Sequence, residues 1–384
     1  MVNKKRKICI PISTRGNYGK LKSTLRSIEK NNNLEYQLII AGGLVLSSYG
    51  NFREIIKEDG FNIAGELPFL LDGDSIENIS ISAGLAQMQF SRLLERLKPD
   101  IVFITADRFE ALSFAQTALC MNKTIAHLEG GEVSGSIDER IRHAITKLSH
   151  IHFVSNKESA ERVRLMGENE KNIVISGNPS IDLINKINVN DTSNLEHFLK
   201  VQNINFNISN PYLVISQHPV VTEIHETFNQ IKNTYEALDK FNIPKFWILP
   251  NIDAGNSSAF KFLQKNIQKS KYPLFLINSM PLELYATLIS NSMCLIGNSS
   301  SGIRESSYLG VPSVNIGNRQ FGRLRGPNTI DCNHSIKSIV DSVQAQISHG
   351  KYNSSNIYGD GNSGKVISNY LEKCELFLDK TITY

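Results

Sequence analysis

The sequence contains no long hydrophobic run. The only apolar stretch near its start, residues 8–12 (ICIPI), is far too short for the core of a signal peptide or for a membrane span. We therefore expect a protein without a membrane partner. Cysteine is also scarce, because the five cysteines are scattered, odd in number and without close pairing. This pattern argues against a disulfide framework and a cysteine zinc site, and it indicates a reducing, cytoplasmic setting.

Charge of one sign is not in large excess either. The formal net charge is +4 over 384 residues, and the only dense basic run is residues 4–7 (KKRK). No basic stripe is interleaved with aromatic residues, so nucleic-acid binding is not expected. Histidines at HExxH spacing, a G-x-G-x-x-G loop and a G-x-S-x-G elbow are all absent. These absences argue against a metal site, a dinucleotide cofactor and a serine hydrolase.

What the sequence does contain is a repeated alternation of apolar runs, polar turns and helical patterns. The apolar runs begin at residues 7, 36, 100, 124, 150 and 172 in the first half, and at 212, 245, 274, 293 and 311 in the second. Continuous apolar strands that alternate with helices predict an α/β fold with a parallel sheet in each half. The length suits two domains, which we place at residues 1–178 and 179–364, followed by an amphipathic C-terminal helix at 365–384.

Acidic side chains follow several predicted strands of the first half. Ligands of open parallel sheets bind beyond the carboxyl ends of the strands, so these positions are candidates for a site. Clustered carboxylates raise one another's pKa, which suits general acid and base catalysis near neutral pH. Each acid could instead cap a helix or pair with Arg108, Arg140 or Arg142. The candidate acids are Asp107, Glu129, Glu132 and Asp138.

Two neighbouring strand-to-helix turns lie in the stretch 297–322 (GNSSSGIRESSYLGVPSVNIGNRQFG). Small residues in the first turn allow N–H groups and hydroxyls to approach a ligand. The helix predicted to open at Arg304 and Glu305 adds the positive end of its dipole, which suits a phosphate. The serines alone could be an ordinary helix cap. The second turn adds Asn318, Arg319, Gln320 and Arg323, so the two turns together indicate a site for an anionic ligand.

Several motifs together resemble one known family. They are STRGNYGKLKS near the start, TADRFE, HLEGGEVSGSIDERIRHAITKLSHIHF from His127, LPNIDAGN, and GNSSSGIRE followed by GVPSVNIGNRQFGR. In this order they resemble the hydrolysing UDP-N-acetylglucosamine 2-epimerases of sialic and legionaminic acid biosynthesis, over nearly the whole chain. The resemblance implies a GT-B-like pair of doubly wound Rossmann-like domains with a cleft between them. The C-terminal helix would pack back toward the first domain.

The resemblance also implies the reaction. UDP leaves by anti-elimination across C1–C2 to give a 2-acetamidoglucal, and syn addition of water then releases N-acetylmannosamine. No metal, nicotinamide or other cofactor is implied, and the partners are a nucleotide sugar and further copies of the chain, as a homodimer or homotetramer.

The family's site residues can be placed on matching positions of this chain. Asp107, Glu129 and Asp138 match the catalytic acids jointly, without a division of roles. His218, before a proline at a strand end, matches a histidine near the diphosphate, although its position also suits a purely structural hydrogen bond. The nucleotide would be held by Arg15, Ser300, Ser301, Gly302 and Glu305. Further substrate or loop contacts would come from Asn251, Asp253, Arg319 and Arg323.

Some positions depart from the family pattern. Gly16-Asn17 stands where an Ala-Asp pair is common, Ala106 where glycine is common, and Asn318 where aspartate is common. Alternatives therefore stay open: the same reaction on a UDP- or GDP-linked 2,4-diacetamido-2,4,6-trideoxyhexose, a GT-B glycosyltransferase, or a non-catalytic nucleotide-sugar binding protein. Non-hydrolysing epimerases carry D-S-G-G-x-Q-E-E where this chain has Ser-Ser-Ser-Gly-Ile-Arg-Glu-Ser, so the sequence favours hydrolysis.

Overall fold

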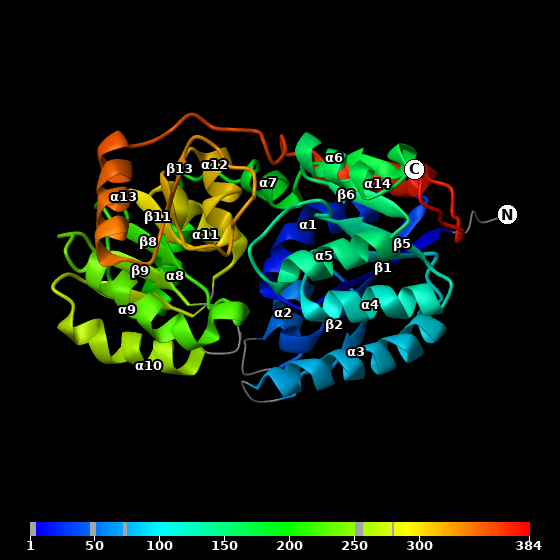
Figure 1. Cartoon of the computed structure of the whole chain (residues 1–384), viewed down its shortest axis with the longest axis horizontal. Coiled ribbons are helices and arrows are strands. Elements are labelled where there is room, and N and C mark those ends of the chain that lie inside the picture. Colours follow the sequence, from blue (N-terminus) through cyan, green and yellow to red (C-terminus); the bar gives the residue numbers. More distant parts are fainter. Residues whose placement is uncertain (1–4, 47–50, 72–74, 250–255, 279) are drawn as a thin grey trace. The chain divides into compact units, whose positions relative to one another are not determined.

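In the computed structural model, residues 5–46, 51–71, 75–249, 256–278 and 280–384 are described. The chain divides into two compact units, each an alternation of strands and helices around a parallel sheet (Figure 1). The first unit comprises Met1–Glu132, Asp138–Leu183 and Gly359–Tyr384, and the second comprises Val133–Ile137 and Ile184–Tyr358. The predicted α/β fold with a parallel sheet in each half is thereby confirmed.

The first sheet has the strand order β3-β2-β1-β4-β5-β6-β7, and every pair of neighbours is parallel. The sequence analysis missed β3, because this edge strand is half-exposed and contains Gly65 and Glu66 instead of a continuous apolar run. The strands are β1 (Arg6–Ile12), β2 (Leu34–Ala41), β3 (Ile63–Leu67), β4 (Ile101–Thr105), β5 (Thr124–Leu128), β6 (Ile151–Val154) and β7 (Ile173–Ile175).

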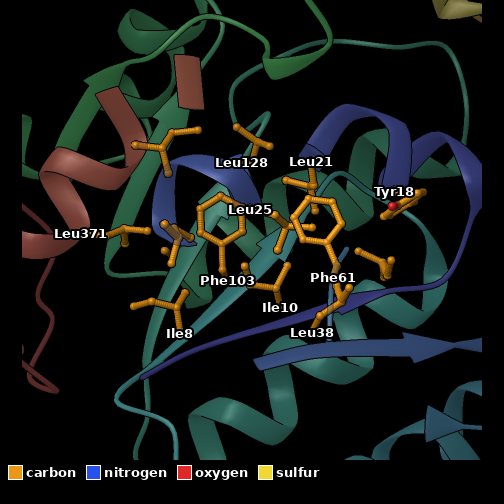
Figure 2. Close-up of a cluster of buried hydrophobic side chains, with 14 of the residues drawn as sticks. Ile8, Ile10, Tyr18, Leu21, Leu25, Leu38, Phe61, Phe103, Leu128 and Leu371 are labelled. Carbon is orange, nitrogen blue, oxygen red and sulfur yellow. The ribbon is translucent and has the colours of Figure 1, made fainter. Parts of the chain in front are cut away.

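Helices cover both faces of this sheet. Buried side chains of α1, α2 and α14 pack on one face, and those of α3, α4 and α5 pack on the other. Figure 2 shows Leu371 of α14 in the same cluster as Ile8, Leu25 and Phe103, so the last helix completes the core of the first unit. The helices are α1 (Arg15–Glu29), α2 (Phe52–Glu58), α3 (Ile76–Leu97), α4 (Phe109–Cys120), α5 (Ile137–Leu148), α6 (Lys157–Leu165), α7 (Pro179–Ile184) and α14 (Ser363–Lys373).

The first unit extends to Leu183, beyond the boundary at residue 178 that the sequence analysis placed. Helix α7 accounts for the difference, since it is tied to the first unit by hydrogen bonds. The hydroxyl of Ser23 donates to the carbonyl of Pro179 at 3.3 Å. The carboxylate of Asp182 accepts from the backbone N–H groups of Ser363 and Gly364 at 2.8 and 2.7 Å, and thereby caps the start of α14.

The predicted helix over 365–384 is wrong in its second half. Helix α14 ends at Lys373, and residues 374–384 form a non-helical tail. The tail is fixed by Lys380, whose Nζ lies 2.6 Å from Oε2 of the buried Glu168. The same ammonium donates to the carbonyls of Lys147 and Ser149, at 2.8 and 2.5 Å, where α5 ends. These tertiary contacts outweigh the helical periodicity of the tail.

The second sheet has the strand order β10-β9-β8-β11-β12-β13, again with parallel neighbours. Its edge strand β13 was missed for the same reason as β3, because it is largely half-exposed and contains Asp331. The strands are β8 (Leu213–Ser216), β9 (Lys245–Ile248), β10 (Leu274–Ile277), β11 (Cys294–Gly297), β12 (Ser313–Ile316) and β13 (Thr329–Cys332). The helices are α8 (Ser193–Val201), α9 (Thr227–Leu238), α10 (Asn256–Asn266), α11 (Leu282–Ser290), α12 (Glu305–Leu309) and α13 (Ile336–His349).

Both sheets reverse their strand order at one point. In the first unit the reversal lies between β1 and β4, and in the second between β8 and β11. Ligands of doubly wound sheets bind outside the carboxyl ends of the strands at such a switch point. Arg15 and Asp107 follow the two strands at the first switch point, and His218 and the serine-rich turn follow the two strands at the second. None of the helices in the described part of the chain has the length and apolar composition that a membrane span needs.

Candidate active site

Two neighbouring strands of the first sheet end in unusual backbone conformations. Ala106, after β4, and Glu129, after β5, have φ values of +63° and +71°. A left-handed conformation costs a residue with a side chain about 1–2 kcal/mol, so it persists only where the surroundings hold it. The N–H of Ala106 donates to the carbonyl of Leu128 at 3.1 Å, and the N–H of Glu129 donates to that of Phe153 at 3.0 Å. Strain of this kind concentrates at active sites.

Glu129 is only 3% exposed and is held by two side chains from distant parts of the first unit. The ammonium of Lys20, on α1, lies 3.0 Å from both carboxylate oxygens. The amide of Asn178, just before α7, donates to Oε1 at 2.6 Å. Sequence reasoning did not single out Lys20 or Asn178, although Lys20 lies inside the STRGNYGKLKS motif. The result is a buried carboxylate with a fixed orientation and a cation beside it.

Asp107 contacts the guanidinium of Arg142, a side chain on α5 that is 1% exposed. The other terminal nitrogen of Arg142 donates to Oε2 of Glu139 at 2.6 Å and to the carbonyl of Glu132 at 2.9 Å. Burial acts to lower the pKa of Arg142, but the negative charges of Asp107, Glu132 and Glu139 outweigh it and raise that pKa above its usual value. Arg142 therefore stays protonated, and the pairing with Arg142 that the sequence left open for these acids exists for Asp107.

The remaining predicted acids lie on or near α5. Glu132 is buried and accepts a hydrogen bond of 2.6 Å from the hydroxyl of Ser155. Asp138 is half-buried in the first turn of α5, where the helix dipole favours a negative charge. Asp138 and Arg142 are four residues apart and so share one face of the helix. Asp107, Glu132 and Glu139 thus surround the buried guanidinium of Arg142, one of the three arginines that the sequence had left open as partners of the acids.

In the second unit, Asn298 joins the two strands at the switch point. Its side-chain oxygen accepts from the N–H of His218 at 2.7 Å, and its side-chain nitrogen donates to the carbonyl of the same residue at 2.8 Å. Asn298 is fully buried, whereas the imidazole of His218 is half-buried. This double hydrogen bond fixes the backbone of His218 beside the serine-rich turn that follows β11.

The hydroxyls of the serine-rich turn form a connected network. Oγ of Ser301 lies 2.9 Å from Oγ of Ser299 and 2.7 Å from the hydroxyl of Tyr285, on α11. Oγ of Ser300 accepts from the guanidinium of the buried Arg304 at 2.9 Å. Burial raises the pKa of Tyr285 to about 12, so its hydroxyl keeps its proton. Tyr285 was missed, because it is far from the turn in sequence and nothing near it marks a site.

The helix after this turn is shorter than the sequence analysis assumed. One 3-10 turn, Ser300–Gly302, precedes α12, which starts at the buried Glu305 and has only five residues. The N–H of Gly302 donates to the carbonyl of Ser299 at 3.1 Å, and the N–H of Ile303 donates to that of Ser300 at 3.0 Å. Because α12 has only five residues and these N–H groups already donate within the turn, the helix dipole can contribute little to phosphate binding here. Hydroxyls and guanidinium groups are therefore better candidates than the helix dipole for contact with an anion at this turn.

Arg319 and Gln320 brace the same turn from the loop after β12. A guanidinium nitrogen of Arg319 donates to the carbonyl of Asn298 at 3.0 Å, and the amide of Gln320 donates to that carbonyl at 2.9 Å. Arg323, in the same loop, is buried, and Arg15 is half-buried at the start of α1. Asn251 and Asp253 lie outside the described residues. Within the described ranges, no group of three or more His, Cys, Asp or Glu side chains is arranged to hold a metal ion.

Asn298→Ala should lower the free energy of unfolding by about 2 kcal/mol, because it leaves the N–H and the carbonyl of His218 without their buried partners. Asn298→Asp keeps an acceptor for the N–H but sets a carboxylate oxygen against the carbonyl of His218 at a fully buried position, so we expect a decrease at least as large. Urea unfolding of the two variants and the parent protein measures both. Equal stability of Asn298→Ala and the parent would contradict a structural role for this double hydrogen bond.

Ala106→Gly should stabilise the protein by about 1 kcal/mol, because glycine adopts a positive φ without the steric cost that alanine bears. The matched control is Ala111→Gly on α4. There the same change should destabilise the protein by about 1 kcal/mol, because glycine has more backbone freedom in the unfolded chain and loses it when the helix forms. Thermal unfolding of both variants measures the two effects. A decrease in stability for both would show that the bend at Ala106 is not strained.

Comparison with known proteins first defines the class of fold. The structure superposes on a Methanocaldococcus jannaschii UDP-GlcNAc 2-epimerase in complex with UDP-GlcNAc and UDP, with a TM-score of 0.79 over 95% of this chain and 99% of the other, at 18% identity. A UDP-GlcNAc 2-epimerase from Neisseria meningitidis bound to UDP-GlcNAc gives 0.79 at 16% identity, over 96% of this chain and 100% of the other. The fold is therefore a GT-B-like pair of doubly wound domains, as the sequence analysis expected.

Sequence comparison then gives the family. Residues 26–372 match the family model for UDP-N-acetylglucosamine 2-epimerase, and the chain belongs to this family. A UDP-N-acetylglucosamine 2-epimerase of Neisseria meningitidis serogroup B is 33% identical over 96% of this chain and 94% of its own length. A hydrolysing GDP/UDP-N,N'-diacetylbacillosamine 2-epimerase of Campylobacter jejuni is 35% identical over 85% of this chain and 84% of its own length.

Proposed function

We propose that this protein is a hydrolysing nucleotide-sugar 2-epimerase that converts UDP-N-acetylglucosamine to N-acetylmannosamine and UDP, for the synthesis of sialic-acid-type sugars. The observation that carries the proposal is the pair of carboxylates at the strained ends of β4 and β5, each beside a buried or half-buried cation. Asp107 and Glu129 are thereby oriented at the edge of the sheet where ligands of this fold class bind. Membership of the epimerase family supports the same reaction type.

In the proposed reaction, a carboxylate removes the proton from C2 while the C1–O bond breaks and its electron pair leaves with UDP. Water then adds to the resulting glycal, its oxygen to C1 and a proton to C2 on the same face. Positioned general acids and bases contribute about 10²–10⁴-fold to such steps. We assign the proton transfers jointly to Asp107, Glu129 and Asp138, and we place His218 near the departing diphosphate.

The nucleotide is proposed to bind through the serine-rich turn. Hydroxyls of Ser300 and Ser301 with the backbone of Gly302 would contact phosphate oxygens, with Arg15 as a further cation. The carboxylate of Glu305 would accept from the ribose hydroxyls. For Arg319, the hydrogen bond to the carbonyl of Asn298 supports bracing of the loop as its role. We also expect a homodimer or homotetramer, which a measurement of mass in solution tests.

A second substrate is favoured by one specific observation. The hydrolysing epimerase of Campylobacter jejuni, named for GDP/UDP-N,N'-diacetylbacillosamine, is 35% identical, and a Legionella pneumophila epimerase named for the UDP-linked sugar is 31% identical over 94% of this chain. We therefore propose a UDP- or GDP-linked 2,4-diacetamido-2,4,6-trideoxyhexose as the alternative substrate. Parallel assays of UDP-N-acetylglucosamine and the two diacetamido substrates decide between them by the ratio of their kcat/KM values.

The reaction type is tested by running the assay in heavy water. We expect a free 2-epimerised sugar, UDP or GDP, and deuterium at C2, because the C2 proton is lost to the carboxylates and replaced from solvent. An unlabelled product would contradict elimination. A product still linked to the nucleotide would contradict hydrolysis. Consumption of the nucleotide sugar only in the presence of an acceptor would indicate a glycosyltransferase.

A further inference from the structure

His127, on β5, is a fully buried polar side chain for which the proposed chemistry gives no role. Its Nε2 lies 3.0 Å from the carbonyl oxygen of Ala106, the residue with the left-handed backbone just before Asp107. Its Nδ1 lies 3.2 Å from the hydroxyl of Thr146, on α5. Helix α5 also carries Arg142, the partner of Asp107. The imidazole therefore contacts both elements that supply the Asp107–Arg142 pair.

The two contacts determine the tautomer of the ring. A carbonyl oxygen can only accept, so Nε2 must carry the proton that is donated to Ala106. In a neutral imidazole Nδ1 is then an acceptor, and the hydroxyl of Thr146 shares its one proton between Nδ1 and the carbonyl oxygen of Arg142, which lies 3.0 Å away. Burial, the largest influence, lowers the pKa of His127 to about 4, so the ring is neutral across the physiological range. The ring is a one-directional link: it receives a hydrogen bond from α5 and donates one to the end of β4.

The surroundings leave the ring little freedom to move. A Cβ atom added at Gly130 would lie 3.0 Å from the Thr146 hydroxyl and 3.2 Å from Nδ1 of His127, so the glycine makes room for this contact. On the neighbouring strand β6, His152 lies opposite His127, and its own Nε2 is bound to the buried Glu168 at 3.0 Å. Close packing of this kind holds the His127 ring in one orientation.

The bend at Ala106 is held at both of its polar groups. Its N–H donates to the carbonyl of Leu128, the residue after His127, and its carbonyl accepts from the His127 ring. Loss of the second bond would remove one of the two hydrogen bonds that oppose relaxation of the left-handed residue, whose conformation costs about 1–2 kcal/mol. Relaxation would move Asp107, because its own backbone begins where that of Ala106 ends.

We propose that His127 is a positioning residue: by binding the Ala106 carbonyl and the Thr146 hydroxyl, it fixes Asp107 in register with Arg142 for proton transfer at the substrate. It acts through Asp107 and does not itself touch the substrate. The catalytic part of this inference rests on the proposed function, whereas the tautomer and the hydrogen bond to Ala106 do not. An error of about 1 Å in the position of a catalytic group can lower a rate by about 10²-fold, so such a role is measurable.

The first test compares His127→Gln with His127→Met. The two side chains have the same length and nearly the same volume, but only glutamine can donate to the Ala106 carbonyl. We expect His127→Met to lower kcat on the order of 10²-fold with little change in KM, and His127→Gln to keep most of the parental kcat. Equal kcat values for the two variants would overturn the proposal. Nucleotide affinity, measured by calorimetry with UDP, should be the same in both, since the serine-rich turn that is proposed to bind the nucleotide lies in the other unit.

If His127→Met fails to fold, His127→Asn takes its place. Asparagine is a donor that is too short to reach the carbonyl, so it should behave like methionine in kcat; activity equal to that of His127→Gln would overturn the proposal.

The second test uses the unaltered protein and needs no turnover. Nitrogen-15 NMR of labelled histidines should show one ring protonated at Nε2 and without titration between pH 5.5 and 8, and its signal should be absent from the His127→Gln variant. A signal for this ring that is protonated at Nδ1, or that titrates in this range, would overturn the assignment. If the parent turns over no nucleotide sugar, the proposed function fails, and the NMR result still decides whether His127 holds Ala106.

Discussion

Replacing Asp107 by asparagine should lower kcat by about 10²–10⁴-fold, the contribution typical of a positioned general acid or base. Asparagine has the same size and can still accept a hydrogen bond from Arg142, but its amide cannot take up a proton. The fold and the affinity for UDP should therefore stay close to those of the parent. Steady-state assays with UDP-N-acetylglucosamine, or with the diacetamido sugar if that is the better substrate, measure the change in kcat.

Glu139→Gln is the matched control for Asp107→Asn. Oε2 of Glu139 lies 2.6 Å from Nη1 of the same Arg142 guanidinium. Each of the two substitutions therefore replaces one carboxylate beside Arg142 by a neutral amide. If the role of Asp107 were only to neutralise Arg142, the two variants would lose similar activity. We expect Glu139→Gln to keep most of the parental kcat. A loss in Glu139→Gln as large as in Asp107→Asn would favour the structural interpretation of the acids.

The interior of the fold was predictable because buried parallel strands carry a local signal. Runs such as residues 8–12 and 101–104 are wholly buried, and their continuous apolar character follows from helices on both faces of the sheet. The two edge strands β3 and β13 lack that signal, because they are partly exposed to solvent and so include polar residues. The C-terminal tail carried a helical periodicity that Lys380 and its buried partner overrode.

Residues of the candidate site could be predicted only where they directly follow a strand. Acids after β4 and β5 lie at the ligand-binding edge in any sheet of this kind, so Asp107 and Glu129 could be identified. Lys20 could not, because its contact with Glu129 joins residues 109 positions apart, and such a contact leaves no local pattern. The left-handed backbone of Ala106 had one sequence signal, because the resembled family commonly has glycine at this position and glycine adopts a positive φ freely.

The Glu168 cluster is the feature on which the stability of the first unit should depend most. Glu168 is 2% exposed and is contacted by Lys147 at 2.7 Å, His152 at 3.0 Å and Lys380 at 2.6 Å. Burial acts to raise the pKa of this carboxyl, but hydrogen bonds from these three side chains outweigh burial and lower the pKa to about 2. A carboxyl whose pKa is lower in the folded than in the unfolded state stabilises the fold when it is ionised.

Glu168→Gln should therefore lower the free energy of unfolding at pH 7 by about 3 kcal/mol, the value of a pKa lowered from 4.5 to about 2, because Lys147 and Lys380 lose the carboxylate that they share. In the parent this stabilisation is present above about pH 5 and is lost as the pH falls toward 2, whereas the variant should lose less stability over that range. Glu161→Gln is the matched control: Glu161 pairs with Arg164 on the surface, where solvent screens the pair and its loss should change stability little. Urea midpoints at pH 7 and pH 4 measure both effects. If the two variants were equally stable at pH 7, the tail that carries Lys380 would not be fixed by this charge, and the non-helical course of residues 374–384 would need another cause.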